Sequence, residues 1–319
     1  MSRCSNPNCF VHDGDTCCMG ELNHEDCPSW SHNKATENSD LERNENYISF
    51  RVPWSSSALG SSDLSRLYQQ GPSIFIGLLG AQNTGKTTFL AANYLQLLSG
   101  EKYNNFDFCG SQTLGAWESI ASWARINNEK QLPSFPPHTP RGVDRTPGIL
   151  HLILQDSNDK IKNIFLTDAP GEWFTRWSID VDAIDAAGAK WTASQSDAFL
   201  IFADCEKLAG EERSVARREL RTIIERLGES VGSRPTVLVW AKSDKQPTEG
   251  IKKAIQRALE SNIPHAKEFE VTVEDPASFT IALESILNEA WIPRFCEPIT
   301  EPILGNSSFL AFRGHHEKF

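Results

Sequence analysis

Residues 80–87 combine glycines, a lysine and threonines at a spacing that suits phosphate chemistry. They read Gly-Ala-Gln-Asn-Thr-Gly-Lys-Thr and match the pattern G-x-x-x-x-G-K-S/T without a mismatch. Main-chain N–H groups of such a loop converge on a phosphate at a helix N-terminus, whose dipole also favours negative charge. The Lys86 ammonium would neutralise the β- and γ-phosphates, and the Thr87 hydroxyl would ligate a magnesium ion. The residues expected at the nucleotide phosphates are Gly80, Asn83, Thr84, Gly85, Lys86, Thr87 and Thr88.

A second segment with chemical potential is Asp168-Ala169-Pro170-Gly171, which reads D-x-x-G at the end of a predicted strand. The Asp168 carboxylate can hold magnesium through a water molecule. The main-chain N–H of Gly171 can contact the γ-phosphate. Together with the phosphate loop, this segment predicts a site for a nucleoside triphosphate and Mg²⁺.

A third segment, Ala241-Lys242-Ser243-Asp244, follows another predicted strand. The Asp244 carboxylate can accept hydrogen bonds from the N1–H and N2–H₂ groups of guanine, an edge that adenine does not offer. The alkyl stem of Lys242 can cover the plane of the base. Both segments lie at carboxyl ends of strands, where ligands of open α/β sheets bind. We therefore expect guanine nucleotides, GTP and GDP, as ligands.

These segments need a sheet and helices to position them, and the hydrophobic pattern predicts both. An apolar strand at 74–79 precedes the phosphate loop, and a helix at 88–95 follows it, with Gly100 as its stop. Runs at 149–154 and 161–166 flank a turn and predict a hairpin. Further strands are expected at 198–203, 236–240 and 269–273, and further helices at 211–227 (ended by Gly228), 250–259 and 277–291. This order predicts a three-layer α/β fold with a mostly parallel sheet and one antiparallel edge hairpin.

The three motifs, in this order, resemble those of Ras-like and translation-factor-like (TRAFAC) P-loop GTPases over residues 71–295. Within that clade, Asp-Ala-Pro-Gly-Glu-Trp-Phe at 168–174 and Phe-Ala-Asp-Cys-Glu-Lys-Leu-Ala-Gly at 202–210 look like the bacterial double-GTPase type associated with conflict or defence systems. The resemblance implies a Mg²⁺-dependent switch that hydrolyses GTP slowly, has protein partners at its switch regions or N-terminal module, and takes part in antiviral defence.

The resemblance also implies a switch threonine just before the hairpin. Thr146 is the best candidate and Thr139 is the alternative. Its hydroxyl would join Thr87 on magnesium in the GTP state and leave when the γ-phosphate is lost. Arg141 and Arg145 flank Thr146, and either is a candidate arginine finger or a solvated loop residue. The expected catalytic residues are Lys86, Thr146, Gly171 and Glu172.

Three positions depart from the pattern of the resembling family. Glu172 stands where many relatives have glutamine; its carboxylate could orient water or act as a base, but it repels phosphate. Ala241 replaces an Asn or Thr, which removes a side-chain tie to the phosphate loop. Gln82 occupies a loop position that is often glycine. The last base-contacting loop of the clade, expected after 269–273, has no recognisable motif.

Cysteines cluster at the start of the chain, where Cys4, Cys9, Cys17, Cys18 and Cys27 account for five of the eight. In a reducing compartment such clusters are more often metal ligands than disulfides. We expect tetrahedral zinc on Cys4, Cys9, Cys17 and Cys27, with Cys18 competing with Cys17 and with His12 and His24 as possible replacements. Cys109, Cys205 and Cys296 are expected to be core residues.

Composition sets the remaining expectations. The 319 residues carry a net charge of −11, which argues against a general nucleic-acid groove. No stretch reaches membrane-span length and no apolar signal region is seen at the N-terminus, so we expect a cytoplasmic protein. The expected organisation is a zinc-binding module at 1–30, a linker and approach segment at 31–70, and the GTPase domain at 71–295, followed by a tail at 296–319. The domain carries an insertion at 101–140 that is expected to be helical in its first part and proline-rich in its second.

Two other functions fit parts of this pattern. An ATP-using phosphotransferase would share the phosphate loop, but it would need an acceptor site and lid arginines. A scaffold that binds nucleotide without hydrolysing it is compatible with Glu172 and with the long insertion.

Overall fold

The computed structural model describes residues 3–4, 30–31, 58–60, 63–64, 67, 71–100, 103, 105–124 and 148–292. The chain divides into two compact units, Met1–Phe50 and Arg51–Phe319. In the first unit, the backbone of β1 (Arg3–Cys4) pairs antiparallel with β2 (Trp30–Ser31). No helix among the described residues is long and apolar enough to cross a membrane.

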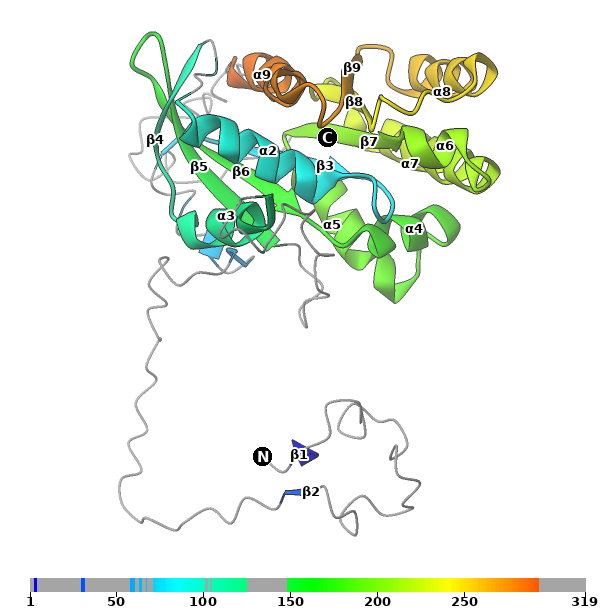
Figure 1. Cartoon of the computed structure of the whole chain (residues 1–319), viewed down its shortest axis with the longest axis horizontal. Helices are drawn as coiled ribbons and strands as arrows, with labels where there is room; N and C mark the ends of the chain where they lie inside the picture. The colour runs from blue at the N-terminus through cyan, green and yellow to red at the C-terminus, as the bar shows by residue number, and fades with distance from the viewer. Residues whose placement is uncertain are drawn as a thin grey trace, which may run out of the picture. The chain divides into compact units, whose positions relative to one another are not determined.

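The second unit is built on a seven-stranded sheet in the order β4-β5-β6-β3-β7-β8-β9 (Figure 1). Parallel pairing joins β6, β3, β7, β8 and β9, whereas β4, β5 and β6 pair antiparallel. The strands are β3 (Ser73–Leu79), β4 (Phe106–Gly110), β5 (Gly148–Asp156), β6 (Ile161–Asp168), β7 (Ala198–Asp204), β8 (Thr236–Ala241) and β9 (Lys267–Val271). The fold class expected from the sequence is thereby confirmed.

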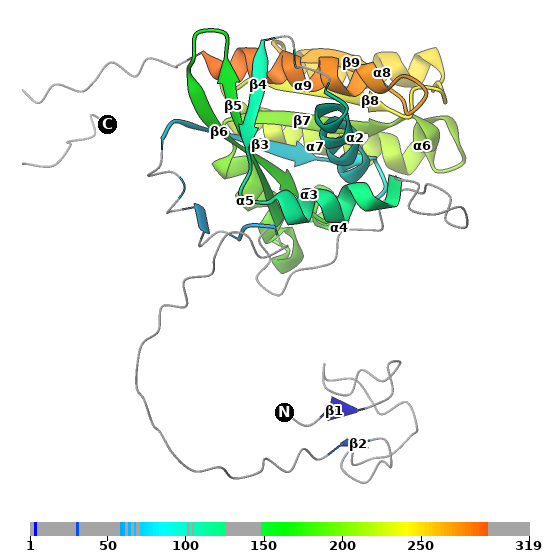
Figure 2. The same cartoon turned by 60° about the vertical axis from the view of Figure 1, so that its left-hand side comes forward.

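Helices cover both faces of this sheet. One face packs against α2 (Lys86–Leu98), α3 (Leu114–Ala121) and α9 (Pro276–Trp291), which stand in front of the strands in Figure 2. The other face packs against α4 (Gly171–Ile179), α5 (Ala187–Gln195), α6 (Cys205–Ala209), α7 (Arg213–Val231) and α8 (Glu249–Asn262). Short 3₁₀ turns are η4 (Ser122–Ala124) and η5 (Ile184–Ala186). Because both faces are covered, every residue of β7 and β8 is buried, as in other parallel sheets.

The predicted hairpin forms β5 and β6, and β4 adds a further strand beside it that the sequence did not reveal. Its sequence, Phe-Asp-Phe-Cys-Gly, is short and ends in a bulge between Phe108 and Gly110. Edge strands have one solvated side, which explains why Cys109 is exposed rather than in the core. Cys205 is buried as expected, and burial raises the pKa of its thiol to about 12.

The predicted end of α7 at Gly228 is wrong, because the helix continues to Val231 and is followed by Gly232 with φ of 56°. Gly228 serves the packing of α7 on α8 instead. A Cβ atom there would lie 2.8 Å from the Cβ of Asn262, closer than side chains tolerate. The glycine therefore marks a close contact between two helices rather than a helix stop.

His151 fastens α3 and β6 to β5 from a fully buried position. Its Nδ1 accepts the Gln112 main-chain N–H at 3.0 Å, so the proton is on Nε2, which lies 3.0 Å from Asn163 Oδ1. The His151 carbonyl also accepts the Trp117 indole N–H at 2.9 Å. Burial lowers the pKa of His151, although the bond to Asn163 works in the opposite direction. A second proton, on Nδ1, would occupy the lone pair that accepts the Gln112 N–H, so the folded protein disfavours the charged form of His151.

We expect the free energy of unfolding to fall as the pH drops below about 6.5, the ordinary pKa of histidine. In that range the unfolded chain takes up a proton at His151 that the folded protein does not bind. One such proton gives a slope of at most about 1.4 kcal/mol per pH unit. Urea denaturation at several pH values should show that His151→Gln lacks this part of the pH dependence of the free energy of unfolding. The control is His265→Gln, which replaces an exposed histidine and should keep it. Identical slopes for wild type and His151→Gln would contradict the assignment.

Candidate functional site

The sequence-predicted site residues meet at the carboxyl edge of the sheet. The phosphate loop follows β3, Asp168 ends β6, and Lys242 and Asp244 follow β8. Because these strands are parallel, their carboxyl ends lie on one side. A cavity of about 530 Å³ opens there, a volume within the usual range for small-molecule sites. Its lining includes ten of the predicted residues: Asn83, Thr84, Gly85, Lys86, Thr87, Thr88, Gly171, Glu172, Lys242 and Asp244.

The phosphate loop has the backbone shape of an anion cradle. Asn83 and Gly85 have φ of 66° and 91°, both in the left-handed region. Such alternation of left- and right-handed residues turns successive N–H groups toward one point. The Thr84 hydroxyl donates to the Ala81 carbonyl at 3.0 Å and braces the loop. The loop leads directly into α2, a helix of 13 residues, so the helix N-terminus faces the cavity.

Lys86 is buried, with a relative exposure of 6%. Its ammonium donates to the Gly80 and Ala81 carbonyls at 2.7 and 3.0 Å and lies 5.6 Å from the centre of the Phe174 ring. Burial lowers the pKa of Lys86 to about 8, against the opposing influence of Asp168 and Glu172. A buried cation whose hydrogen bonds go to neutral carbonyls is well suited to attract an anionic ligand.

Thr87 and Asp168 place hard oxygen ligands side by side. The Thr87 hydroxyl donates to Asp168 Oδ1 at 2.9 Å, across the gap between α2 and β6. Asp168 is 8% exposed. Hydroxyl and carboxylate oxygens are what Mg²⁺ takes from proteins when phosphates supply other ligands. This donor set fits a magnesium ion.

Gly171 opens α4 and lies against the phosphate loop. A Cβ atom at this position would lie 2.4 Å from both the Cα and the N of Gln82. Only a glycine lets α4 approach the loop this closely. The D-x-x-G segment and the phosphate loop are thus packed against each other, with Glu172 in the first turn of α4 at the cavity.

We expect Gly171→Ala to destabilise the protein by about 1–3 kcal/mol, the usual cost of overpacking against rigid backbone. Chemical denaturation measures this change. The matched control is Gly250→Ala in α8, because a Cβ there meets no atom within 4 Å. The control should be neutral or slightly stabilising, since alanine is the better helix former. Equal stability of wild type and Gly171→Ala would show that α4 does not need its close approach.

At the far end of the cavity, Asp244 is oriented by a residue that sequence analysis did not single out. The Thr272 hydroxyl donates to Asp244 Oδ1 at 3.3 Å, and Lys245 lies 3.6 Å from Oδ2. Thr272 and Val273 follow β9 and line the cavity. The strand expected at 269–273 ends at Val271, so Thr272 and Val273 belong to the segment that follows it.

Lys242 has acidic partners that its motif does not specify. Its ammonium donates to Asp204 Oδ2 at 2.8 Å and to Glu206 Oε2 at 2.9 Å. Burial opposes the charge of Lys242, but these two bonds outweigh it and raise the pKa of the ammonium. Lys242 lines the cavity with a φ of 57°. The ammonium is held at Asp204 and Glu206 while the stem is available at the cavity.

Other predicted residues are not placed by the structure. Thr146, Thr139, Arg141 and Arg145 lie outside the described residues, as do Cys9, Cys17 and Cys27. Only the backbone of Cys4 is described, in β1. The part of the chain that is described holds no group of three or more His, Cys, Asp or Glu side chains able to bind a metal. Trp173 and Trp177 of α4 are buried in the core.

The chain is also similar in sequence to a known protein family. A family model described as Double-GTPase 2 matches residues 74–292, which include the sheet from β3 to β9 and all three motifs. No curated protein matches the chain.

Proposed function

Because the chain belongs to the Double-GTPase 2 family, we propose that it is a Mg²⁺-dependent GTPase that hydrolyses GTP slowly and acts as a molecular switch. The observation that carries this proposal is the shared cavity. One end presents Lys86 and the phosphate loop, and the other presents Asp244 held by Thr272. A guanosine triphosphate needs both a phosphate cradle and an acceptor for the guanine edge.

Each part of the site has a role in this reaction. The loop amides and Lys86 bind the phosphates, while Lys242 and Asp244 select guanine. Thr87 and Asp168 would hold magnesium, with Thr146 as a further ligand in the triphosphate state. Magnesium supplies positive charge that offsets the charge developing on the phosphate oxygens. The Gly171 N–H would contact the γ-phosphate.

Glu172 accounts for the slow rate in this proposal. Its carboxylate lines the cavity close enough to Lys86 to favour the charged ammonium. A carboxylate can orient or deprotonate an attacking water, but it also repels the phosphate. Loss of the γ-phosphate would release the segment around Thr146, as in other switches.

Calorimetric titration with GTP, GDP and ATP in the presence of magnesium tests the proposal, together with phosphate release under multiple-turnover conditions. We expect GTP and GDP to bind, ATP to bind much more weakly, and phosphate release from GTP to be slow. Binding of GTP without turnover would favour a nucleotide-stabilised scaffold. Preferential binding of ATP would favour a phosphotransferase and contradict the assignment of Asp244.

The N-terminal cysteines belong to a separate part of the proposal. We infer from their clustering that Cys4, Cys9, Cys17 and Cys27 hold a structural zinc ion in a module that docks a partner protein. Elemental analysis of full-length protein prepared without chelator should find about one zinc per chain. Its absence would leave the cysteines as free thiols. A place in a bacterial defence system is proposed from resemblance alone.

A further inference from the structure

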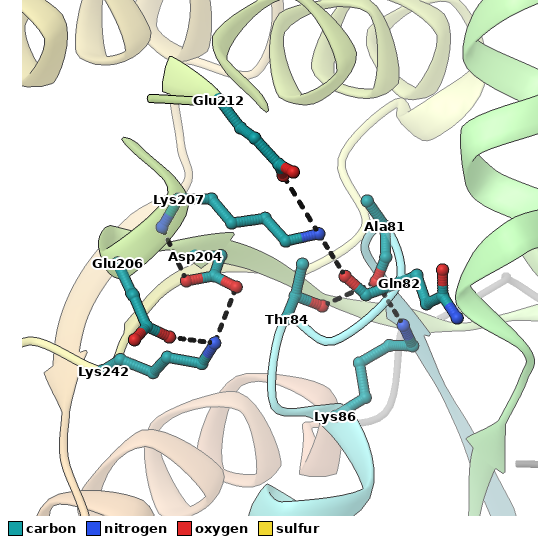
Figure 3. Close-up of polar contacts among 9 residues, drawn as sticks. All are labelled: Ala81, Gln82, Thr84, Lys86, Asp204, Glu206, Lys207, Glu212 and Lys242. Carbon is teal, nitrogen blue, oxygen red and sulfur yellow. Dashed lines mark hydrogen bonds and ion pairs between the residues drawn. The ribbon is translucent and has the colours of Figure 1, made fainter. Parts of the chain in front are cut away.

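The first turn of α6 touches both ends of the nucleotide site, although it belongs to none of the three motifs. Figure 3 shows the contacts: Lys207 reaches the phosphate loop, and Asp204 and Glu206 reach Lys242. Asp204 ends β7 and is only 4% exposed. The segment 204–207 therefore lies between the loop after β3 and the loop after β8.

Lys207 contacts the phosphate loop from outside the large cavity. Its ammonium donates to the Gln82 carbonyl at 3.1 Å. Its other partner, Glu212, is exposed and 4.0 Å away, so that ion pair is weak. Lys207 is not among the residues that line the large cavity; it lines a space of about 20 Å³ with Ala81 and Thr84. Lys207 and Lys86 approach the loop from different sides (Figure 3).

Three consecutive carbonyls of the loop are thus bound by ammonium groups. Lys86 binds those of Gly80 and Ala81, and Lys207 binds that of Gln82. A trans peptide is planar, and its C=O and N–H point in opposite directions. With the Gln82 carbonyl turned to Lys207, the N–H of Asn83 in the same peptide must point away from Lys207, toward the cavity. Asn83 is one of the loop residues expected to bind phosphate.

Asp204 connects this arrangement to the guanine end. Its Oδ1 accepts the Lys207 main-chain N–H at 3.2 Å, and its Oδ2 accepts the Lys242 ammonium at 2.8 Å. Ala241, directly before Lys242, packs near Gly85 but has no polar side-chain atom to bind the phosphate loop. The contacts of Asp204 and Lys207 supply a polar connection between the two loops.

We propose that Lys207 is a positioning residue of the nucleotide site, which holds the Gln82–Asn83 peptide so that the Asn83 N–H faces a phosphate, and that Asp204 couples this peptide to Lys242. This inference rests on the proposed GTPase function. A bound triphosphate would attract the Lys86 ammonium away from the Gly80 and Ala81 carbonyls. Lys207 would then be the ammonium that keeps the loop peptides turned, because it cannot reach the cavity without leaving Gln82.

The test compares Lys207→Met, Lys207→Arg and Lys253→Met in the full-length protein. Lys253 is an exposed lysine of α8 with an ion pair to Glu249, so its variant controls for loss of a lysine. We expect Lys207→Met to bind GDP and GTP with magnesium about tenfold or more weakly, the size of one lost charge-assisted hydrogen bond. Lys207→Arg should recover most of the affinity, and Lys253→Met should match wild type. Melting without nucleotide should be similar in all four proteins.

The possible outcomes separate the inference from the proposed function. Wild-type affinity in Lys207→Met overturns the inference and leaves the GTPase intact. Weak binding accompanied by early melting, without recovery in Lys207→Arg, also overturns it, because it indicates a purely structural role. Failure of the wild-type protein to bind any guanine nucleotide overturns the proposed function, and the inference with it.

The connection through Asp204 has its own measurement. Asp204→Asn, which keeps the size and the helix cap, weakens the hold on Lys242. If the two ends are coupled, the loss of GTP affinity in the double variant with Lys207→Met should be smaller than the product of the single losses. Losses that simply multiply would show that the two loops act independently and would overturn the coupling.

Discussion

Replacing Lys86 with alanine is expected to weaken GTP and GDP binding by about 100-fold or more and to abolish measurable turnover. The ammonium is buried at the phosphate end of the cavity, where water screens its charge little. Its partners there are the neutral carbonyls of Gly80 and Ala81, which a phosphate oxygen can replace. Isothermal titration with GDP and a phosphate-release assay with GTP measure the two effects.

Two further variants make the Lys86 result interpretable. Lys86→Met keeps most of the side-chain volume, so that loss of binding in both variants reflects the charge rather than a cavity. Lys190→Ala removes a partly exposed lysine that pairs with Asp182, and it should leave nucleotide affinity unchanged. Turnover in Lys86→Ala equal to that of wild type would show that the hydrolysis measured does not occur at this site.

The lowered pKa of Lys86 gives this residue a signature in the pH dependence of binding. Below pH 8 the ammonium is already charged in the nucleotide-free protein, so affinity should vary little on its account. Above pH 8 the free protein loses this proton, and binding must take it up again. Affinity should therefore fall with rising pH, by at most about tenfold per unit. Lys86→Met should lack this fall.

Asp244→Asn is expected to reduce GTP affinity by about 1,000-fold, because a site built to accept guanine hydrogen bonds loses its acceptor. The substitution preserves shape but places an amide NH₂ opposite the donors of the guanine edge. Thr272 holds the Asp244 carboxylate in place, so the acceptor is preorganised in the wild-type protein. Competition for a labelled nucleotide by GTP, XTP and ATP would measure the change.

The Asp244→Asn substitution should also raise the affinity for XTP relative to GTP. Xanthine carries an oxygen where guanine carries its amino group, and the new amide can donate to that oxygen. XTP should therefore bind the variant better than GTP does. The weak ATP affinity should not change, and Lys245 loses only an exposed ion partner at 3.6 Å. Unchanged GTP affinity would mean that the base is read by other residues.

The sequence predicted the core of the fold well because its central strands are long apolar runs. Residues 198–203 and 236–240 are buried on both faces of the sheet, and such runs leave little ambiguity. The elements that escaped prediction are short, and they include the nine-residue helices α4 and α5. Strand β4 has a bulge and only five residues, and α6 likewise has five. Gly228 led to a predicted helix end that does not exist, because the sequence alone does not distinguish a glycine needed for close helix packing from one that ends a helix.

For the candidate site, sequence patterns indicate the residues whose spacing is fixed by local structure. Gly80 to Thr87 spans one loop and the start of α2, and Asp168 to Gly171 spans the end of β6 and the start of α4, so each motif is contiguous in the chain. The partners of Lys242 and Gln82 depend on which strand end lies beside which, and no local pattern encodes that. An aspartate that ends a buried strand and is followed by Glu206 and Lys207 was the available signal for the α6 contacts.

The close approach of Gly171 to the phosphate loop has an optical consequence. Helix α4 starts at this contact and carries Trp173 and Trp177, whose indole rings are both buried, and no hydrogen-bond acceptor among the described residues reaches the Trp177 indole N–H. We expect a rearrangement of the loop around a ligand to reach these rings, because they lie in the first two turns of α4. The chain thus carries its own fluorophores at the junction, and ligand exchange could be followed in real time by intrinsic emission without a label.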